Sequence, residues 1–234
     1  MKTNCILPCL LVLCAACQTA APGNGKGQWH PSVATPPQWT GTYADTLPCA
    51  DCPGIFTRLD LRPDSTYVLR ELYLERDSIP FGTIGTWRSH GDRLTLNTFG
   101  DPLQWRWAGD SLQRLGPGGE AISTSLPNAV RRVPSLQPSA MHLTGGYFFQ
   151  DGSHSFTPCG TTLSFPVLAD PVNAPGPVQQ LDQTYVKEVK EAGRPLYVQI
   201  TATIRSGPAM EGDGTQEYIQ VDQVDGLNML QGCR

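Results

Sequence analysis

The chain has 234 residues, a formal net charge of −4 and only 16% charged residues. Its 24 glycines and 21 prolines favour many short strands joined by turns, and they argue against a protein built from long helices. The length is more than one small barrel needs and suits two domains. We therefore expect a mainly β protein with two small antiparallel β-barrel domains.

Residues 1–16 have the features of an export signal. The apolar stretch Ile6–Ala16 is shorter than the about 20 apolar residues that a membrane-spanning helix needs. Two alanines then precede Cys17, which is the pattern of a bacterial lipoprotein cleavage site, although Cys14 stands where leucine is usual. We predict that residues 1–16 are a signal peptide and that Cys17 carries a lipid anchor; the alternative is ordinary cleavage after Ala21.

Residues 17–38 are predicted to be the lipid anchor followed by a flexible tether. The segment is rich in Gly, Pro, Ala and Thr, and its one large apolar side chain is Trp29. A flexible chain spans about 5–6 Å times the square root of its residue number. The tether would therefore hold the first domain away from the membrane surface.

Strand signals follow one another from Trp39 onwards. The stretch Ile55–Leu61 alternates between an apolar face and a mainly polar face, as a half-buried strand does. Further strands are predicted at Thr66–Arg76, Gly82–Ser89, Arg93–Phe99, Pro102–Ala108 and Ser111–Leu115. Turns rich in Gly and Asp join them, which predicts an up-and-down meander that closes into a lipocalin-like barrel over residues 39–134.

Five aromatic residues of this region are predicted to fill the barrel, because small barrels are usually packed by side chains. They are Phe81, Trp87, Phe99, Trp105 and Trp107. The stretch Leu126–Ala140 is predicted to be a proline-punctuated join between the domains, with Arg131-Arg132 as solvated surface.

The loop Leu47–Ile55 reads Leu-Pro-Cys-Ala-Asp-Cys-Pro-Gly-Ile and carries two cysteines at CxxC spacing between two strands. A redox catalyst is disfavoured, because Asp51 opposes a thiolate and the nearest cation in the sequence is Arg58. Structural zinc needs four ligands, and the first domain offers no further cysteine and a single histidine, His90.

Two interpretations of Cys49 and Cys52 are then left with equal weight. A pair of thiolates suits the soft ion Cu(I), for which two ligands suffice when the ion is handed over at an exposed site. An ordinary local disulfide suits the oxidising compartment that the export signal indicates. Chemistry alone does not separate the two.

Residues 141–234 carry the pattern of a second barrel. Predicted strands lie at His142–Gln150, Ser153–Gly160 and Thr161–Leu168, followed by a helix at Pro177–Ala192, an alternating strand from Leu196 to Ile204 and a last strand at Glu217–Val224. The order of three strands, a helix and two strands is that of an OB-fold. Many OB-folds bind nucleic acid, but this domain has five basic and ten acidic residues, and a net charge of −5 excludes a phosphate-backbone partner.

Cys159 and Cys233 are the two cysteines of the second domain. In an exported protein such a pair is most simply a disulfide, which here would attach the carboxyl end to the barrel.

Several motifs resemble the NlpE family of bacterial envelope lipoproteins. They are the lipobox, Tyr43, the stretch Leu47–Ile55 and the Thr-Arg-Leu-Asp-Leu stretch Thr57–Leu61. The segment from Leu112 to Pro127 is similar to the end of that family's first domain. In the second half, Cys159, Pro166-Val167, Tyr185, Gly193-Arg194-Pro195, Glu211-Gly212 and Cys233 resemble, in this order, its OB-like C-terminal domain.

The resemblance implies an outer-membrane lipoprotein that faces the periplasm or the cell surface. It implies a role in copper homeostasis and in signalling surface and envelope stress to a Cpx-type sensor kinase. By the same resemblance Cys49 and Cys52 are Cu(I) ligands, Cys17 is the anchor, and Cys159 with Cys233 form a redox-monitoring disulfide. No catalytic residue and no organic cofactor are implied.

The competing hypothesis is a lipocalin-like carrier of a small apolar ligand, in which the CxxC disulfide is purely structural. Aromatic residues that would line its pocket are Tyr67, Tyr73, Trp105 and Trp107. An enzyme is the weakest hypothesis, because no Ser-His-Asp pattern, paired carboxylates or phosphate loop stands out and the four histidines are scattered.

Overall fold

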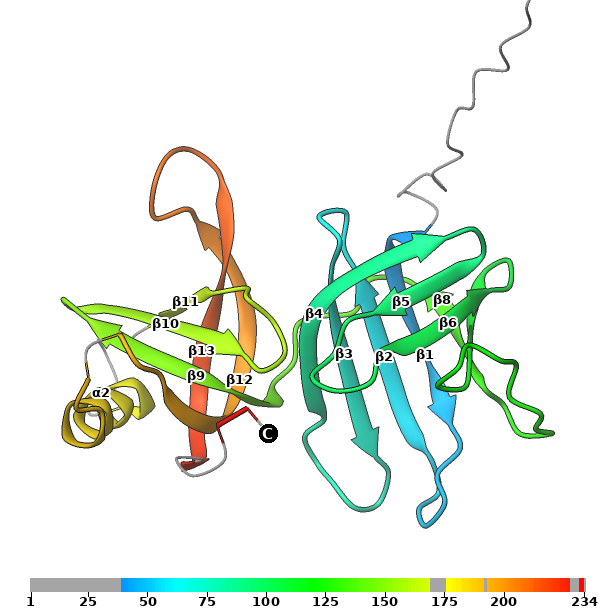
Figure 1. Ribbon diagram of the computed structural model, residues 1–234, viewed down its shortest axis with the longest axis horizontal. Coiled ribbons are helices and arrows are strands. Elements are labelled where there is room, and N and C mark those ends of the chain that lie inside the picture. Colours follow the sequence, from blue (N-terminus) through cyan, green and yellow to red (C-terminus); the bar gives the residue numbers. More distant parts are fainter. Residues whose placement is uncertain (1–38, 169–175, 192, 228–231, 234) are drawn as a thin grey trace, which may run out of the picture. The chain divides into compact units, whose positions relative to one another are not determined.

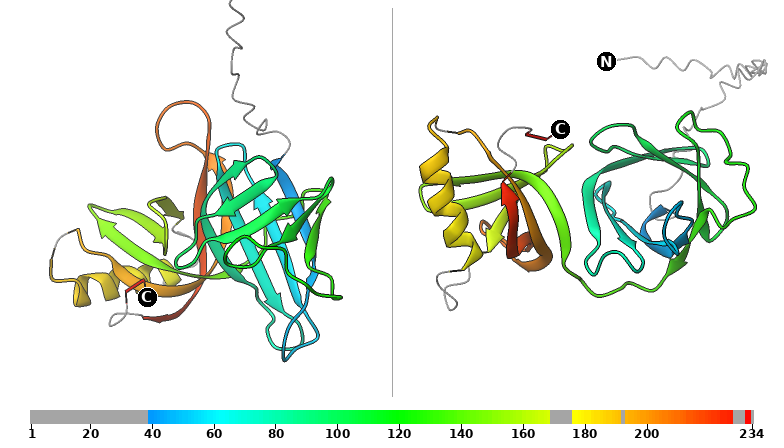
Figure 2. Two further views of the ribbon diagram at one scale, coloured as in Figure 1. Left: turned by 45° about the vertical axis from the view of Figure 1, so that its right-hand side comes forward. Right: turned by 90° about the horizontal axis from the view of Figure 1, so that it is seen from below.

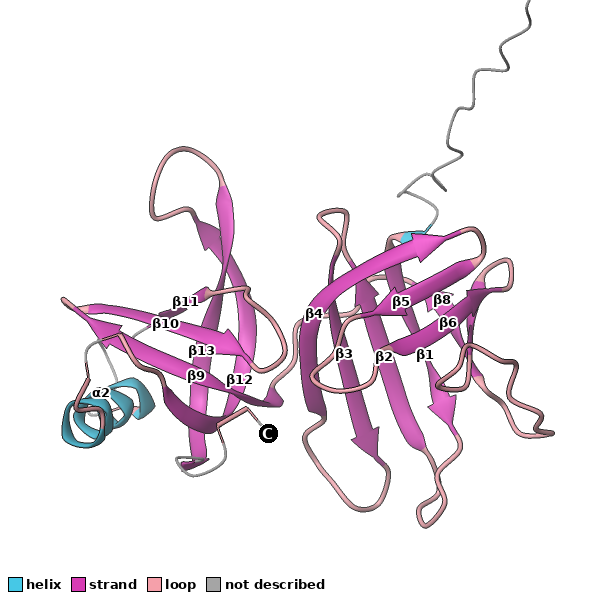
Figure 3. Cartoon of the chain, in the orientation of Figure 1, coloured by secondary structure: helices cyan, strands magenta, loops and turns pink. Residues whose placement is uncertain are grey.

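The structure is a computed structural model that describes residues 39–168, 176–191, 193–227 and 232–233. The predicted signal peptide, Cys17 and the tether of residues 17–38 lie outside the described residues. The described chain is mainly β (Figure 3). No helix among these residues is long and apolar enough to cross a membrane.

The first domain contains strands β1 to β8 (Figure 1). Their bounds are β1 (Gly41–Leu47), β2 (Ile55–Leu61), β3 (Thr66–Tyr73), β4 (Phe81–His90), β5 (Arg93–Leu96), β6 (Leu103–Trp107), β7 (Ser111–Arg114) and β8 (Ala129–Val133). Each strand pairs antiparallel with the next, and β8 pairs back with β1. The sheet is therefore a closed barrel, seen end-on in the right view of Figure 2, and the predicted lipocalin-like meander is confirmed.

The interior of this barrel is filled by the apolar residues that alternate along each strand and point inwards. Leu59 and Leu61 of β2 are 0% and 3% exposed, as their spacing predicts. They belong to one buried cluster with Trp39, Tyr43, Tyr67, Leu69, Trp87, Leu94, Leu96, Trp105, Leu112 and Val130. Burial of these large apolar side chains is the main favourable term for a small barrel.

The prediction that Phe81 and Phe99 fill the barrel is wrong. Their exposed fractions are 49% and 51%, because Phe81 is the first residue of β4 and Phe99 lies in the loop after β5. Trp87 and Trp105 are buried in the core as predicted, and Trp107 packs against it.

The join between the domains is shorter than predicted, because Ala129–Val133 forms β8 and closes the barrel. Arg131 and Arg132 are both exposed, yet Arg132 has a structural role. Its guanidinium lies over the rings of Tyr43 and Trp107, at 4.9 and 5.7 Å from their centres, and donates a hydrogen bond to the Tyr43 hydroxyl at 2.6 Å. Burial raises the pKa of Tyr43 to about 12, so this hydroxyl stays protonated at neutral pH.

The second domain contains β9 (Met141–Gln150), β10 (Ser153–Pro158), β11 (Phe165–Leu168), α2 (Pro177–Glu188), β12 (Leu196–Pro208) and β13 (Thr215–Leu227). The strands close a ring in the order β9, β10, β11, β13, β12 and back to β9. Only the β11–β13 pair of this ring is parallel. This is the predicted OB-fold, and the helix lies between its third and fourth strands.

Helix α2 packs its apolar face on the second barrel. Val178, Leu181 and Tyr185 are buried, as the predicted spacing requires. The helix begins at Pro177, before which the Gln179 amide oxygen accepts a hydrogen bond from the Gly176 backbone at 2.8 Å. It ends at Glu188, four residues before the predicted end, because Val189 is extended with a ψ of 109°.

Candidate metal centre

The CxxC loop lies at one end of the first barrel, where three strands meet. The last pair of the β1–β2 register is Leu47 with Ile55, so residues 48–54 form the hairpin loop between these strands. The chain after β3 runs beside the loop, and the Leu74 backbone N–H donates to Gly54 O at 3.0 Å. The loop is therefore supported by neighbouring backbone on one side and open to solvent on the other.

Gly54 is needed in this loop because a side chain has no room there. A Cβ atom at this position would lie 2.4 Å from Thr46 Cγ2 and 3.3 Å from Leu47 O. Gly54 does not adopt a positive φ, so close packing, and not a left-handed backbone conformation, sets the requirement for glycine.

The Sγ atoms of Cys49 and Cys52 are joined in a disulfide. Both cysteines are partly exposed and Asp51 between them is exposed. Asp51 Oδ1 lies 3.5 Å from Cys49 Sγ, and the carbonyl oxygen of Gly54 lies 3.3 Å from Cys52 Sγ. The structure thus shows the oxidised form of the pair, in which neither sulfur is a thiolate.

Sequence reasoning missed the cation that meets this loop. Arg76, in the turn after β3, donates from Nη1 to Asp51 Oδ2 at 2.9 Å, and its guanidinium lies 5.7 Å from the Tyr73 ring centre. Both partners of this ion pair are more than half exposed. Arg58, the nearest cation in the sequence, instead bonds Asp60 and backbone carbonyls outside the loop.

Cys49, Asp51 and Cys52 form the one group of three potential metal ligands that the described residues bring together, with ligand atoms within 4.8 Å of one another. Once reduced, two thiolates suit soft Cu(I), whereas a closed structural zinc site needs four ligands. The carboxylate is a harder ligand, so its contribution is mainly its negative field. The donor set therefore fits a two-thiolate Cu(I) site that opens to solvent.

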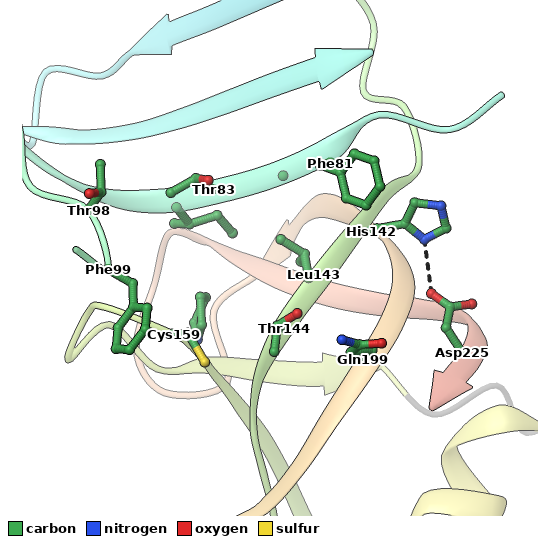
Figure 4. A pocket seen from close by; sticks show the side chains of 13 residues that line it. Phe81, Thr83, Thr98, Phe99, His142, Leu143, Thr144, Cys159, Gln199 and Asp225 are labelled. Carbon is green, nitrogen blue, oxygen red and sulfur yellow. Dashed lines mark hydrogen bonds and ion pairs between the residues drawn. The ribbon is translucent and has the colours of Figure 1, made fainter. Parts of the chain in front are cut away.

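The histidines within the described residues lie away from this loop. His90 is the last residue of β4, and β4 begins beside the end of β3, so His90 lies at the opposite end of the barrel. His142 on β9 directs Nδ1 at the Asp225 carboxylate at 3.0 Å (Figure 4). His142 therefore has an acidic partner within the second domain.

His154 also contacts a carboxylate in the second domain. Its Nδ1 lies 3.1 Å from Asp182 Oδ1 on α2, and the buried Tyr147 donates its hydroxyl to the same oxygen at 2.6 Å. Burial, together with this carboxylate, raises the pKa of Tyr147. The cluster ties α2 to the strands below it and offers no site comparable to the CxxC loop.

A second disulfide joins Cys159 and Cys233, which are 74 residues apart. Cys159 lies one residue beyond the end of β10 and not within a strand, and its backbone N–H donates to Thr144 O at 2.9 Å. The bond attaches the C-terminal segment to the second barrel.

These features define a class of protein: two small β-barrels in one chain, with a CxxC hairpin at the end of the first and a long-range disulfide in the second. Two family models match it, the NlpE N-terminal domain over residues 43–125 and the NlpE C-terminal OB domain over residues 137–234. The chain belongs to the NlpE family.

Two curated relatives are similar in sequence. Lipoprotein NlpE of Escherichia coli (strain K12) is 31% identical over 169 residues, which cover 70% of this chain and 66% of that protein. The 17 kDa lipoprotein of Treponema pallidum (strain Nichols) is 37% identical over 84 residues, which cover 35% of this chain and 53% of that protein. The matches thus span just under two thirds and about half of these relatives.

Two solved structures are also similar. The crystal structure of the Cpx pathway activator NlpE from Escherichia coli is 27% identical and covers 82% of this chain and 97% of its own, with a TM-score of 0.34. A candidate lipoprotein from Shewanella oneidensis is 31% identical and covers 40% of this chain and 88% of its own, with a TM-score of 0.36.

Proposed function

We propose that this protein is an outer-membrane lipoprotein that binds Cu(I) through reduced Cys49 and Cys52 and signals copper and envelope stress to a Cpx-type sensor kinase. The observation that carries the proposal is the pair of cysteine sulfurs on an exposed hairpin loop, next to a carboxylate. Family membership supports the envelope role, since one relative is described as a Cpx pathway activator. Cys17 would anchor the chain, with its domains facing the periplasm or the cell surface.

Copper binding requires the disulfide to open first. Two electrons and two protons from a dithiol reductant convert the bond between Cys49 and Cys52 into two thiols, and the reductant becomes a disulfide. A Cu(I) ion then displaces the two thiol protons. The negative field of Asp51 favours the bound cation, and an exposed loop allows the ion to be taken up and released.

The proposed role is sensing or buffering, and it is not catalysis. The Asp51 carboxylate lies on the Cys49 side of the loop, where it opposes the free thiolate that a redox catalyst uses as nucleophile. No organic cofactor is part of the proposal. Nucleic acid is not among the proposed partners, because the second domain carries a net charge of −5.

The test is a competition titration of the full mature chain, in non-ionic detergent and under reducing conditions, against a Cu(I) chelator. We expect one Cu(I) per wild-type chain and none for Cys49→Ser/Cys52→Ser. The matched control is Cys159→Ser/Cys233→Ser, which removes the other cysteine pair and should keep the copper site. Affinity should fall as pH falls, by up to about tenfold per thiol for each pH unit below neutrality, because protons compete for both sulfurs. Equal copper uptake by wild type and Cys49→Ser/Cys52→Ser would refute the site.

Anchoring and signalling are tested separately. Intact-mass measurement should show a lipid on the wild-type chain and none on Cys17→Ala, which should leave the membrane fraction. A Cpx-dependent reporter should respond to copper with the wild-type chain and lose that response with Cys49→Ser/Cys52→Ser. A lipid-free wild-type chain cut after Ala21 would contradict the anchor.

The second candidate, a carrier with a structural disulfide, is favoured by one observation, the closed Cys49–Cys52 bond. Against it, Tyr67 and Trp105, which would line the pocket, are both 0% exposed and packed in the barrel core. A Cys49–Cys52 bond that stays oxidised in cells at every copper level would favour this candidate.

A further inference from the structure

The outer wall of the first barrel carries a concave site rich in arginine. A cavity of about 580 Å³ is lined by Arg58 and Asp60 of β2, Arg70 of β3 and Arg62 in the turn between these strands. Arg58 and Arg70 are direct cross-strand partners, and Asp60 follows two residues along on the same face. Leu59, which lies between Arg58 and Asp60, is buried in the core, so the two charged residues lie on the outer face of β2. We call this cavity the arginine pocket; none of its lining residues belongs to the CxxC loop.

Every nitrogen of the Arg58 guanidinium donates a hydrogen bond within the protein. Its Nε donates to Asp60 Oδ1 at 3.2 Å, and its two terminal nitrogens donate to the carbonyl oxygens of Gln137 and Leu136 at 2.9 Å each. The first domain contributes β1, β2, β3 and the segment from the end of β8 onwards to the pocket lining, and the second domain contributes Ile204, Ser206 and Glu217.

Arg70 has a donor without an acceptor. Its Nη1 donates to Asp60 Oδ2 at 2.8 Å, but its Nε is buried and has no hydrogen-bond partner within the protein. The side chain is 6% exposed. Burial lowers the pKa of Arg70 against the opposing effect of Asp60, so the protein compensates the buried charge only in part. The Nε atom itself is enclosed by protein atoms, so what Arg70 offers a ligand in the pocket is the incompletely compensated positive charge of its guanidinium.

The pocket also carries an excess of positive charge. Four arginines line it, namely Arg58, Arg62, Arg70 and Arg132, against the two carboxylates of Asp60 and Glu217. Arg62 Nη1 forms an ion pair with Glu217 Oε2 at 2.6 Å, and burial raises the pKa of the Glu217 carboxyl. The local excess of two positive charges contrasts with the net charge of −4 of the whole chain.

We propose that the arginine pocket binds a phosphate group, in which phosphate oxygens accept from Arg70 and Arg62. Guanidinium groups match phosphate oxygens in geometry, and a phosphate monoester carries a charge of about −1.5 to −2 at neutral pH, which matches the local excess. The volume of about 580 Å³ leaves room for more than the phosphate itself. The group belongs to a soluble phosphate monoester or to the headgroup of an anionic lipid, and the experiment separates these sources.

The test uses the full mature chain in non-ionic detergent and follows its thermal unfolding. The probes are inorganic phosphate, glycerol 3-phosphate and a soluble short-chain phosphatidic acid, whose headgroup is also a phosphate monoester, each compared with sodium chloride at the same ionic strength. A ligand that binds only the folded state raises the midpoint saturably. A rise with the first two probes assigns the site to soluble monoesters, and a rise with the short-chain lipid assigns it to a headgroup.

Matched arginine variants identify the site. Arg70→Gln and Arg62→Gln should each weaken binding by about tenfold or more, since each removes a charge-assisted hydrogen bond. Arg88→Gln, an exposed arginine of β4 outside the pocket, should bind like the wild type. If Arg70→Gln does not fold, Arg62→Gln, on the partly exposed turn, still tests whether phosphate binds in the arginine pocket. No saturable rise with any probe, or an equal rise in Arg62→Gln and Arg88→Gln, would overturn the proposal. The Cu(I) affinity of the same variants should equal that of the wild type. Failure of the phosphate proposal can therefore be distinguished from failure of the proposed copper site.

Discussion

Opening the Cys159–Cys233 disulfide should destabilise the second domain strongly and leave the first barrel unchanged. The bond closes a loop with a sequence separation of 74 residues. In the chain-entropy model such a cross-link removes unfolded-state entropy worth about 4.4 kcal/mol at 25 °C. The Cys49–Cys52 bond, with a separation of 3, is worth only about 1.6 kcal/mol by the same relation, and it acts on the other domain. Removal of each disulfide is therefore expected to lower the free energy of unfolding by a different amount and in a different barrel.

The placement of tryptophan allows these losses to be read separately. Trp39, Trp87, Trp105 and Trp107 belong to or pack against the core of the first barrel, and residues 141–234 contain no tryptophan, so changes in tryptophan fluorescence report the first barrel. Near-UV circular dichroism of tyrosine also reports the second. For Cys159→Ser/Cys233→Ser we expect a urea midpoint lower by about 2 M for the second domain, with a typical slope of about 2 kcal/mol/M. The fluorescence transition should not move. A fluorescence shift of the same size, or a loss below about 1 kcal/mol in the second domain, would refute independent stabilisation.

Two further predictions concern the first barrel. Gly54→Ala should destabilise it by about 1–3 kcal/mol, because the new methyl group would lie 2.4 Å from Thr46 Cγ2, whereas Ala50→Ser in the exposed part of the same loop should be neutral in the same urea assay. Glu71→Gln should raise the urea midpoint near pH 7 and have little effect near pH 4. Burial raises the pKa of Glu71, so its stabilising contribution is present below the unfolded pKa and is lost as pH rises through the folded value. Equal effects of Glu71→Gln at both pH values would contradict this explanation.

The elements that the sequence predicted well are those in which local pattern and tertiary role agree. In β12 the residues Leu196, Val198, Ile200, Ala202 and Ile204 alternate in the sequence, and all five are buried. Helix α2 buries the face that its spacing predicts, and only its end was misplaced. β3 ends three residues before its predicted end because residues 74–76 form a turn, and β5 likewise ends three residues early, at Leu96.

β8 was missed because its own pattern is weak. Ala129–Val133 has five residues, prolines on both sides and a single buried side chain, Val130. Its identity as a strand comes from its partners β7 and β1, whose free edges it covers. The barrel closes only if a strand lies between β7 and β1. This requirement comes from the tertiary structure and leaves little trace in the local sequence pattern.

The cysteines of the candidate site were visible in the sequence, but the electrostatics of the loop were not. The predicted strands Ile55–Leu61 and Thr66–Arg76 leave a turn centred near residue 64, and counting outward from it pairs Ile55 with Tyr73. Continuing the count brings Asp51 opposite the turn that contains Arg76, so a hairpin register would have found this ion pair. The two carboxylate oxygens then have different neighbours: Oδ2 meets Arg76 Nη1 at 2.9 Å, and Oδ1 lies 3.5 Å from Cys49 Sγ. Because both partners are exposed, the pair contributes little to stability. Its effect is instead to orient Asp51, so that one oxygen is held towards the sulfur pair while the arginine reduces the negative field that a bound cation would experience.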